Sequence, residues 1–384
     1  MHVTHLSLTD YRNYATAEID LSAGATLLVG RNGQGKTNLV EAIGYLSTLG
    51  SHRVSSDQAL IRAGAEAAII RARLQHAGRE LLVEVQLNRG AANRAQVNRS
   101  PIKTRELPRY CHSVLFAPED LALVRGEPGV RRRFLDELLV QQTPRLAGVM
   151  SDYDRVLRQR NTLLKSARSS GLREAQLSTL EIWDERLVTL GSEIIDERSA
   201  LVAELAEPLR VAYRGIVDAD HGPALVPLLS IDGRESADVP VVSEIPAIPT
   251  ADRFRAALAN QRRAELDRGV TLAGPHRDDV LLELNGLPAK GYASHGESWS
   301  FALALKLASA ELLRRDSAGG DPVLILDDVF AELDRRRRES LAAAITGYEQ
   351  VLITAAVLED VPDALAERVV HIHRGEIVDG PRDE

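Results

Sequence analysis

The chain has 384 residues, enough for two or three domains, and its 44% hydrophobic content can build a full core. No apolar run reaches the length of a membrane span, and the start lacks the basic and apolar blocks of a secretory signal, so we expect a cytoplasmic protein with no membrane partner. The single cysteine, Cys111, excludes an internal disulfide and, within the apolar stretch 111–116, is expected to be a small core residue rather than a nucleophile. A net charge of −8 neither indicates nor excludes nucleic-acid binding, because a local basic patch is what contacts phosphates.

Strands alternate with turns in the first part of the chain. We predict strands over residues 3–8 and 15–21, a buried strand from Ala25 to Val29, a helix ending near Leu49, and then a polar turn at Ser51-His52-Arg53. Two further strands, 67–75 and 80–87, should form a hairpin that 97–102 extends.

The most informative motif lies between the buried strand and the first helix. Gly30 and Gly35-Lys36-Thr37 match the phosphate-loop pattern, with Arg31, Asn32, Gly33 and Gln34 between them. Glycines allow the backbone to turn sharply and approach an anion, and the N–H groups and the helix dipole then favour phosphate. Lys36 is predicted to reach the outer phosphates and the Thr37 hydroxyl to hold Mg²⁺, and an ordinary glycine turn is the less favoured alternative.

The middle of the chain is helical. Apolar residues recur at three- and four-residue spacing through residues 131–212, with a break at Ser169-Ser170-Gly171, which predicts an antiparallel helical pair. Residues 221–250 contain several prolines and are expected to form strand fragments and loops.

The last part returns to alternating strands and helices. We predict a strand at 281–284, a helix from Ser298 to Arg315, a helix over 335–347, a buried strand at 350–354 and a terminal hairpin over Arg374-Gly375. Between the two helices lies the wholly apolar strand 323–326, which ends in Asp327 and Asp328. The carboxyl end of such a strand is where parallel sheets bind ligands, so Asp327 is expected to serve Mg²⁺ and Asp328 to orient or deprotonate an attacking water. Two acids that cap the next element are the alternative.

Ser294-His295-Gly296-Glu297 precedes the helix that begins near Ser298, and Glu332-Leu333-Asp334 follows the acidic strand. Taken alone, Ser-x-Gly-Glu is most often an ordinary helix cap. Its position upstream of the acidic strand favours an anion-binding helix start.

The order of these motifs resembles the ABC-type ATPase heads of SMC-like DNA repair proteins, and nearly the whole chain resembles the RecF family. The resemblance rests on residues 10–14, 33–39, 118–121, 126–128, 131–136, 274–279 and 326–334. It implies an α/β phosphate-loop fold in which residues 1–117 form the N-terminal part of the ATPase core, 118–293 an inserted, mainly helical lobe, and 294–384 the signature helix and the rest of the core.

What the resemblance implies about function is an ATP-dependent, DNA-binding recombination mediator. Such proteins act at single-strand gaps with RecR and RecO to load RecA, and support replication recovery and the SOS response, which also implies association with the nucleoid. Two subunits close head to tail around ATP and Mg²⁺, with Ser294 and Gly296 touching the γ-phosphate held by the partner. Duplex, gapped and single-stranded DNA are the implied nucleic-acid partners.

Four positions depart from the wider pattern. Many relatives carry Gln on both sides of the signature glycine, whereas His295 and Glu297 stand here, and a carboxylate beside a phosphate is unfavourable unless it faces away. ABC transporters have Glu after the Mg²⁺ aspartate and His after the next strand, whereas Asp328 and Thr354 stand here. The shorter acid and the missing imidazole predict slow hydrolysis with Asp328 and Lys36 as catalytic groups.

Several arginine clusters are candidates for DNA contact. They are Arg131, Arg132 and Arg133, the set Arg155, Arg158 and Arg160, and residues 335–338. Pairing of Arg131–Arg133 with Asp136, Glu137 and helix carbonyls, and a solvated face for 335–338, are the alternatives. No base-reading element is recognisable, so backbone contacts with strong salt dependence are expected.

Other possibilities remain open from the sequence alone. His276-Arg277-Asp278-Asp279 is expected to be a polar loop that organises the signature helix, with metal ligation as the alternative. An ABC-transporter ATPase subunit is the main alternative function, and a phosphate-loop phosphotransferase is another. The long helical insert and Thr354 disfavour the first, and the Ser-x-Gly motif and Leu333-Asp334 disfavour the second.

Overall fold

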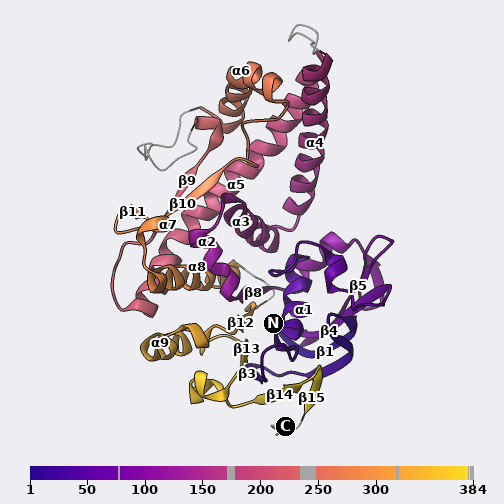
Figure 1. Ribbon diagram of the computed structural model, residues 1–384, viewed down its shortest axis with the longest axis vertical. Helices are drawn as coiled ribbons and strands as arrows, with labels where there is room; N and C mark the ends of the chain where they lie inside the picture. Colours follow the sequence, from indigo (N-terminus) through magenta and orange to yellow (C-terminus); the bar gives the residue numbers. More distant parts are fainter. Residues whose placement is uncertain (77, 171–177, 234–247, 317–319, 379, 381–384) are drawn as a thin grey trace. The chain divides into compact units, whose positions relative to one another are not determined.

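Each of the two units into which the chain divides is built from segments that are distant in the sequence (Figure 1). The computed structural model describes the chain except for residues 77, 171–177, 234–247, 317–319, 379 and 381–384. The first unit comprises residues 1–122, 207–220 and 294–384, and the second comprises 123–206 and 221–293. The first unit therefore includes 118–122 and 207–220, two segments of the expected inserted lobe 118–293.

A mainly parallel sheet in the first unit has the order β15-β14-β3-β13-β12-β8. Its strands are β3 (Gly24–Val29), β8 (Ser113–Phe116), β12 (Val323–Asp327), β13 (Gln350–Ala355), β14 (Val369–His373) and β15 (Glu376–Val378). Every residue of β12 and β13 is buried, as expected of apolar strands covered on both faces. The predicted strands of this part and the terminal hairpin are confirmed, whereas β8 was not predicted as a strand.

An antiparallel sheet in the same unit has the order β2-β1-β4-β5-β6-β7. Its strands are β1 (His2–Tyr11), β2 (Tyr14–Asp20), β4 (Ala67–His76), β5 (Arg79–Asn88), β6 (Arg94–Val97) and β7 (Ser100–Ile102). The predicted hairpin is confirmed, with β4 and β5 paired from Ala67↔Asn88 to His76↔Arg79.

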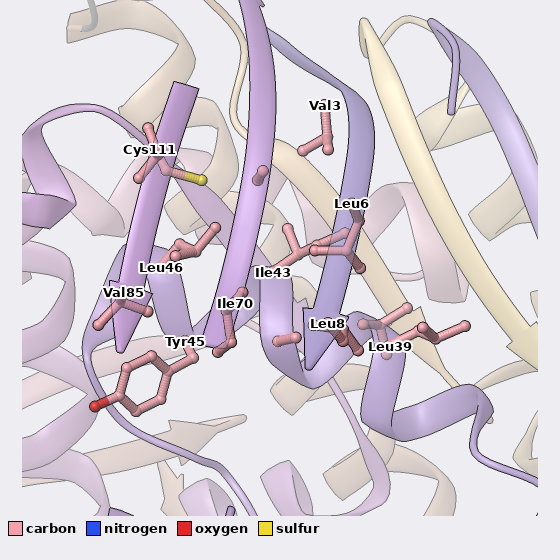
Figure 2. Close-up of a cluster of buried hydrophobic side chains, with 14 of the residues drawn as sticks. Val3, Leu6, Leu8, Leu39, Ile43, Tyr45, Leu46, Ile70, Val85 and Cys111 are labelled. Carbon is pink, nitrogen blue, oxygen red and sulfur yellow. The ribbon is translucent and has the colours of Figure 1, made fainter. Parts of the chain in front are cut away.

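Helix α1 (Lys36–Thr48) and strands of both sheets belong to one hydrophobic cluster. Figure 2 shows the α1 side chain Leu39 beside Leu8 of β1 and the α1 side chain Ile43 beside Leu6 of β1, with Ile70 of β4 close by. Cys111 is buried in this cluster, and burial raises the pKa of its thiol to about 12, so the prediction of a core cysteine is confirmed. The helix that carries Lys36 and Thr37 is thereby fixed in the interior.

The remaining helices of the first unit are α8 (His295–Asp316), α9 (Arg335–Ile345) and the end of α5 (Ser178–Val217), which begins in the second unit. The short helix α2 (Leu121–Arg125) crosses from the first unit to the second. No helix in the described part of the chain is both long and apolar enough to cross a membrane.

The second unit contains α3 (Pro128–Gln142), α4 (Leu146–Ser170), α6 (Thr250–Arg268), the short α7 (Ala289–Tyr292) and most of α5. A small sheet of β9 (Ala224–Leu228), β10 (Asp279–Leu284) and β11 (Leu287–Pro288) accompanies them. Arg145, directly before α4, forms an ion pair with Glu193 of α5, and Arg160 of α4 forms one with Asp184 of α5, so the two helices run as neighbours in opposite directions. The antiparallel pair is therefore confirmed. The predicted break at 169–171 lies largely outside the described residues, and α6 was not predicted.

Candidate functional site

The phosphate loop joins β3 to α1, and packing requires glycine at two of its positions. A Cβ on Gly30 would lie 2.3 Å from the carbonyl oxygen of Ile372 in β14. Gly35 has a φ of +117°, and a Cβ there would lie 2.5 Å from the Tyr14 hydroxyl. The loop therefore packs between β14 on one side and the start of β2 on the other.

Residues 10–14, to which the sequence assigns no role, contact the loop through Asn13. The Asn13 amide donates to the Gln34 carbonyl at 3.4 Å and accepts from the Asn38 amide at 2.7 Å. On the other side, the Gly375 N–H donates to the Gln34 carbonyl at 3.0 Å. These contacts leave Arg31, Asn32 and Gly33 exposed at the crest of the loop.

Lys36 lies over the loop with its ammonium group held by the loop backbone. Its Nζ donates to the Gly30 carbonyl at 2.6 Å and to the Arg31 carbonyl at 3.4 Å. Burial lowers the pKa of this ammonium, while the carboxylates of Asp328 and Asp327 oppose that shift. An ammonium has three donors, so the side chain retains the capacity to bind an anion placed on the loop.

Thr37 and Asp327, distant in the sequence, meet at the carboxyl end of the sheet. The Thr37 hydroxyl donates to Asp327 Oδ1 at 3.0 Å, and the Thr354 hydroxyl donates to the same oxygen at 2.6 Å. Burial favours a raised pKa for Asp327, but the nearby His52 imidazole and the hydroxyl donors of Thr354 and Thr37 outweigh it and hold the pKa below its ordinary value. An ionised carboxylate beside a hydroxyl is a hard oxygen pair of the kind Mg²⁺ prefers, so these residues fit the predicted ion.

Asp328 follows at the strand end in a left-handed conformation, with a φ of +52°. Its N–H donates to the Thr354 hydroxyl at 2.9 Å. Burial raises the pKa of Asp328; Lys36 opposes the shift and Asp327 adds to it. A raised pKa brings a carboxylate closer to the range in which it can accept a proton from water.

The turn after α1, which the sequence predicts only as a polar turn, is part of the site. The Ser51 hydroxyl donates to Glu41 Oε1 at 2.5 Å, and Arg53 Nη1 donates to Asn38 Oδ1 at 3.0 Å. Between them, His52 Nε2 lies 3.8 Å from Asp327 Oδ2. No local sequence signal joins residue 52 to residue 327, because the contact depends on the sheet order.

At the start of α8, Ser294 and Glu297 form a reciprocal helix cap. The Glu297 N–H donates to the Ser294 hydroxyl at 3.2 Å, and Glu297 Oε2 accepts from the Ser294 N–H at 2.8 Å. The Glu297 carboxylate is therefore turned back onto its own helix, and the Ser294 hydroxyl proton stays available to donate. The Arg337 guanidinium packs against Gly296, where a Cβ would lie 2.8 Å from Arg337 Nη1. His295 accepts from Trp299 Nε1 at 2.9 Å.

Two of the arginines considered for DNA contact are buried instead. Arg131, with 7% of its surface exposed, forms an ion pair with Asp279 and donates to the Leu123 and Gly126 carbonyls. Arg160 is fully buried between Asp184 and Glu265. The prediction that Arg131 and Arg160 are DNA-contact candidates is therefore wrong, because their guanidinium donors serve acids from other parts of the chain.

The other arginines are at the surface or half-buried. Arg133, Arg155 and Arg158 are exposed, and Arg155 pairs with Asp152 at 2.9 Å. Arg132 is half-buried and donates to the Asp278 carbonyl at 2.7 Å. The four arginines of 335–338 each bond an acid, namely Glu339, Asp218, Asp334 and Asp360.

The loop 274–279 forms its hydrogen bonds inside the second unit. The His276 ring bonds the Tyr153 hydroxyl at 2.7 Å, and Asp278 Oδ1 accepts from the Ser230 hydroxyl at 2.7 Å and from the Ser230 N–H. In the described residues, no three His, Cys, Asp or Glu side chains are grouped to hold a metal ion. The alternative of metal ligation by this loop thus has no geometric support.

Comparisons with known proteins agree with this architecture. The family model RecF/RecN/SMC N terminal domain matches residues 2–376. A protein of Leifsonia xyli subsp. xyli named DNA replication and repair protein RecF is 69% identical, covering 99% of this chain and all of the relative. A protein of the same name from Streptomyces avermitilis is 55% identical over 95% of this chain and 96% of its own.

Solved structures give the same result. One described as the recombination mediator protein RecF-ATP in the RecFOR pathway has a TM-score of 0.86 and 28% identity, with 98% of this chain and 97% of that chain covered. The Smc head domain of Pyrococcus furiosus, at 16% identity and a TM-score of 0.52 over 98% of this chain and 96% of that chain, shares the fold. By its sequence and by its arrangement of motifs, the chain belongs to the RecF family of SMC-like proteins.

Proposed function

We propose that this protein is an ATP-dependent DNA-binding recombination mediator that acts in DNA replication and repair. The observation that carries the proposal is the meeting of Thr37 and Asp327, 3.0 Å apart, beneath a glycine loop backed by Lys36. Relatives named DNA replication and repair protein RecF, and the similar structure described with ATP, supply the biological context. They favour this function over that of a transporter ATPase.

In the proposed site, the exposed crest of the phosphate loop and the N-terminus of α1 bind the nucleotide phosphates. Thr37 and Asp327 would hold Mg²⁺, which would offset the phosphate charge when bound. Asp328 orients the attacking water, and its raised pKa suits a proton acceptor. Thr354 holds both acids without supplying an imidazole, which supports slow hydrolysis used as a switch.

ATP is proposed to bring two copies together head to tail, so that each Ser294–Gly296 segment contacts the partner's nucleotide. The capped geometry supports this role, because Glu297 is turned onto its own helix and the Ser294 hydroxyl can still donate. The closed dimer binds DNA. Together with RecR and RecO it helps RecA load at single-strand gaps, and so supports replication recovery and the SOS response.

The test is the molar mass by light scattering, with and without ATP and gapped DNA. We expect saturating ATP to double the mass and gapped DNA to strengthen that association. Lys36→Arg should weaken it, because a planar guanidinium does not replace a compact ammonium over the loop. Lys103→Arg, an exposed position of the same unit, is the matched control and should behave as wild type. A mass that stays monomeric at saturating ATP would refute the proposal.

A further inference from the structure

His52 is held against the nucleotide site by contacts on both of its neighbours. The Ser51 hydroxyl donates to Glu41 and accepts from the N–H groups of Arg53 and Val54, at 3.0 and 3.1 Å. Arg53 reaches Asn38, one helical turn before Glu41. The turn is therefore hydrogen-bonded to two successive turns of α1, through Ser51 and through Arg53, and His52 lies between these two residues.

The anchor of this turn is itself rigid. Glu41 is 1% exposed and accepts from Arg12 Nε at 2.8 Å and from Arg12 Nη2 at 2.6 Å. Burial works against its charge, but the hydrogen bonds from Arg12 and Ser51 hold the pKa of Glu41 below its ordinary value. A buried carboxylate with several charge-assisted hydrogen bonds keeps its neighbours in one arrangement.

One ring nitrogen of this imidazole, Nε2, faces Asp327 without forming a hydrogen bond. His52 Nε2 is buried and has no hydrogen-bond partner among the described residues. It lies 3.8 Å from Asp327 Oδ2, which is too far for a direct hydrogen bond. The other carboxylate oxygen, Oδ1, already accepts from Thr37 and Thr354. A buried polar atom without a hydrogen-bond partner costs free energy. An imidazole nitrogen in this position, beside Asp327, therefore indicates a ligand that bonds it.

The chemistry of the expected ion supplies such a ligand. Mg²⁺ dehydrates reluctantly and keeps several bound waters, each of which donates hydrogen bonds. Groups that accept from those waters orient the ion and tune its affinity. We propose that His52, through Nε2, accepts a hydrogen bond from a water of the Mg²⁺ hydration shell, jointly with Asp327 Oδ2, and so positions the ion for the nucleotide. The inference rests on the proposed ATP site and assigns one more residue to it.

The test is the Mg²⁺ concentration needed for half-maximal binding of a fluorescent ATP analogue. His52→Ala should raise that concentration roughly 10-fold, the lower end of what loss of an outer-shell partner of a metal costs. Binding of the same analogue in EDTA should be unchanged, because the proposal gives His52 no contact with the nucleotide itself. His52→Gln, which keeps an acceptor, should restore part of the Mg²⁺ affinity.

His5→Ala is the matched control. The His5 ring also bonds an aspartate, Asp20 at 2.7 Å, but it does so on the β1–β2 pair, so the Mg²⁺ requirement should not change. An unchanged Mg²⁺ requirement in His52→Ala, or an equal loss of binding with Mg²⁺ and in EDTA, would overturn the inference and leave His52 a structural residue. A wild-type chain that binds no ATP would overturn the proposed function as well.

Discussion

A single hydroxyl, that of Thr354, joins the two acids at the end of β12. It donates to Asp327 and accepts from the Asp328 N–H, and the threonine is fully buried. Because β13 lies between β12 and β3 in the sheet, Thr354 can reach the acids from the neighbouring strand. Thr354, which in the sequence is notable only as a threonine in place of histidine, therefore orients both Asp327 and Asp328.

Thr354→Val keeps the shape of the side chain and removes both hydrogen bonds. We expect the free energy of unfolding to fall by about 1–3 kcal/mol, because the half-buried Asp328 N–H loses its acceptor. Urea unfolding followed by Trp299 fluorescence, in a Trp183→Phe background, would measure this in the first unit. Thr354→Ser should lose less, since it keeps the hydroxyl. Equal losses for Val and Ser would contradict this assignment.

At the scale of elements, the loop that leads into β10 holds two oppositely perturbed groups. Burial lowers the pKa of His276 to about 4 and raises the pKa of Asp278 to about 6. Between about pH 6.5 and 4, the unfolded chain protonates His276 before the folded chain does, so this residue lowers stability as the pH falls. In the same window, folded Asp278 protonates first and raises stability. The two contributions oppose each other.

Asp278→Asn should expose the histidine contribution. Between pH 7 and 4.5 the free energy of unfolding of the variant is expected to fall by about 2 kcal/mol more than that of the wild type. The reason is that an asparagine cannot take up the proton that stabilises folded Asp278 in this range. Urea unfolding followed by Trp183 fluorescence, in a Trp299→Phe background, reports on the second unit. Adding His276→Asn should make the pH dependence shallow again. The same pH dependence in Asp278→Asn and wild type would show that these groups do not titrate as described.

Local patterns predicted some elements well and others not at all. The buried strand before Gly30 and the one that ends in Asp327 were predicted because apolar runs and glycine spacing are local signals. Helix α6 was missed, since its sequence has few apolar residues and no clear stripe. The approach of His52 to Asp327 could not be predicted, because it depends on the order of strands in the sheet. Arg131 and Arg160 were misjudged for a similar reason, since their acidic partners lie far along the chain.

For the whole molecule, the net charge of −8 means that DNA affinity has to come from a few local arginines. With Arg131 and Arg160 committed to internal acids, the exposed Arg133 and Arg158 remain the better candidates. Phosphate contacts of this kind depend on salt and not on base sequence.

Arg133→Gln should weaken binding equally on two unrelated duplexes and lower the slope of log affinity against log salt by about 1. Fluorescence anisotropy across a salt series would measure it. Arg335→Gln, whose side chain is 93% exposed and bonded to Glu339 on α9, is the control and should keep the wild-type slope. Affinity that is flat with salt in the wild type would contradict backbone binding altogether.

The seating of Gly30 beneath Ile372, and of Gln34 against Gly375, has a practical consequence for mapping experiments. Clipping the chain before β14 would remove the wall that shapes the glycine turn. If ATP affinity is lost after such limited proteolysis, the reason would be that the phosphate loop has lost its shape, and not that residues after the cut contact the nucleotide.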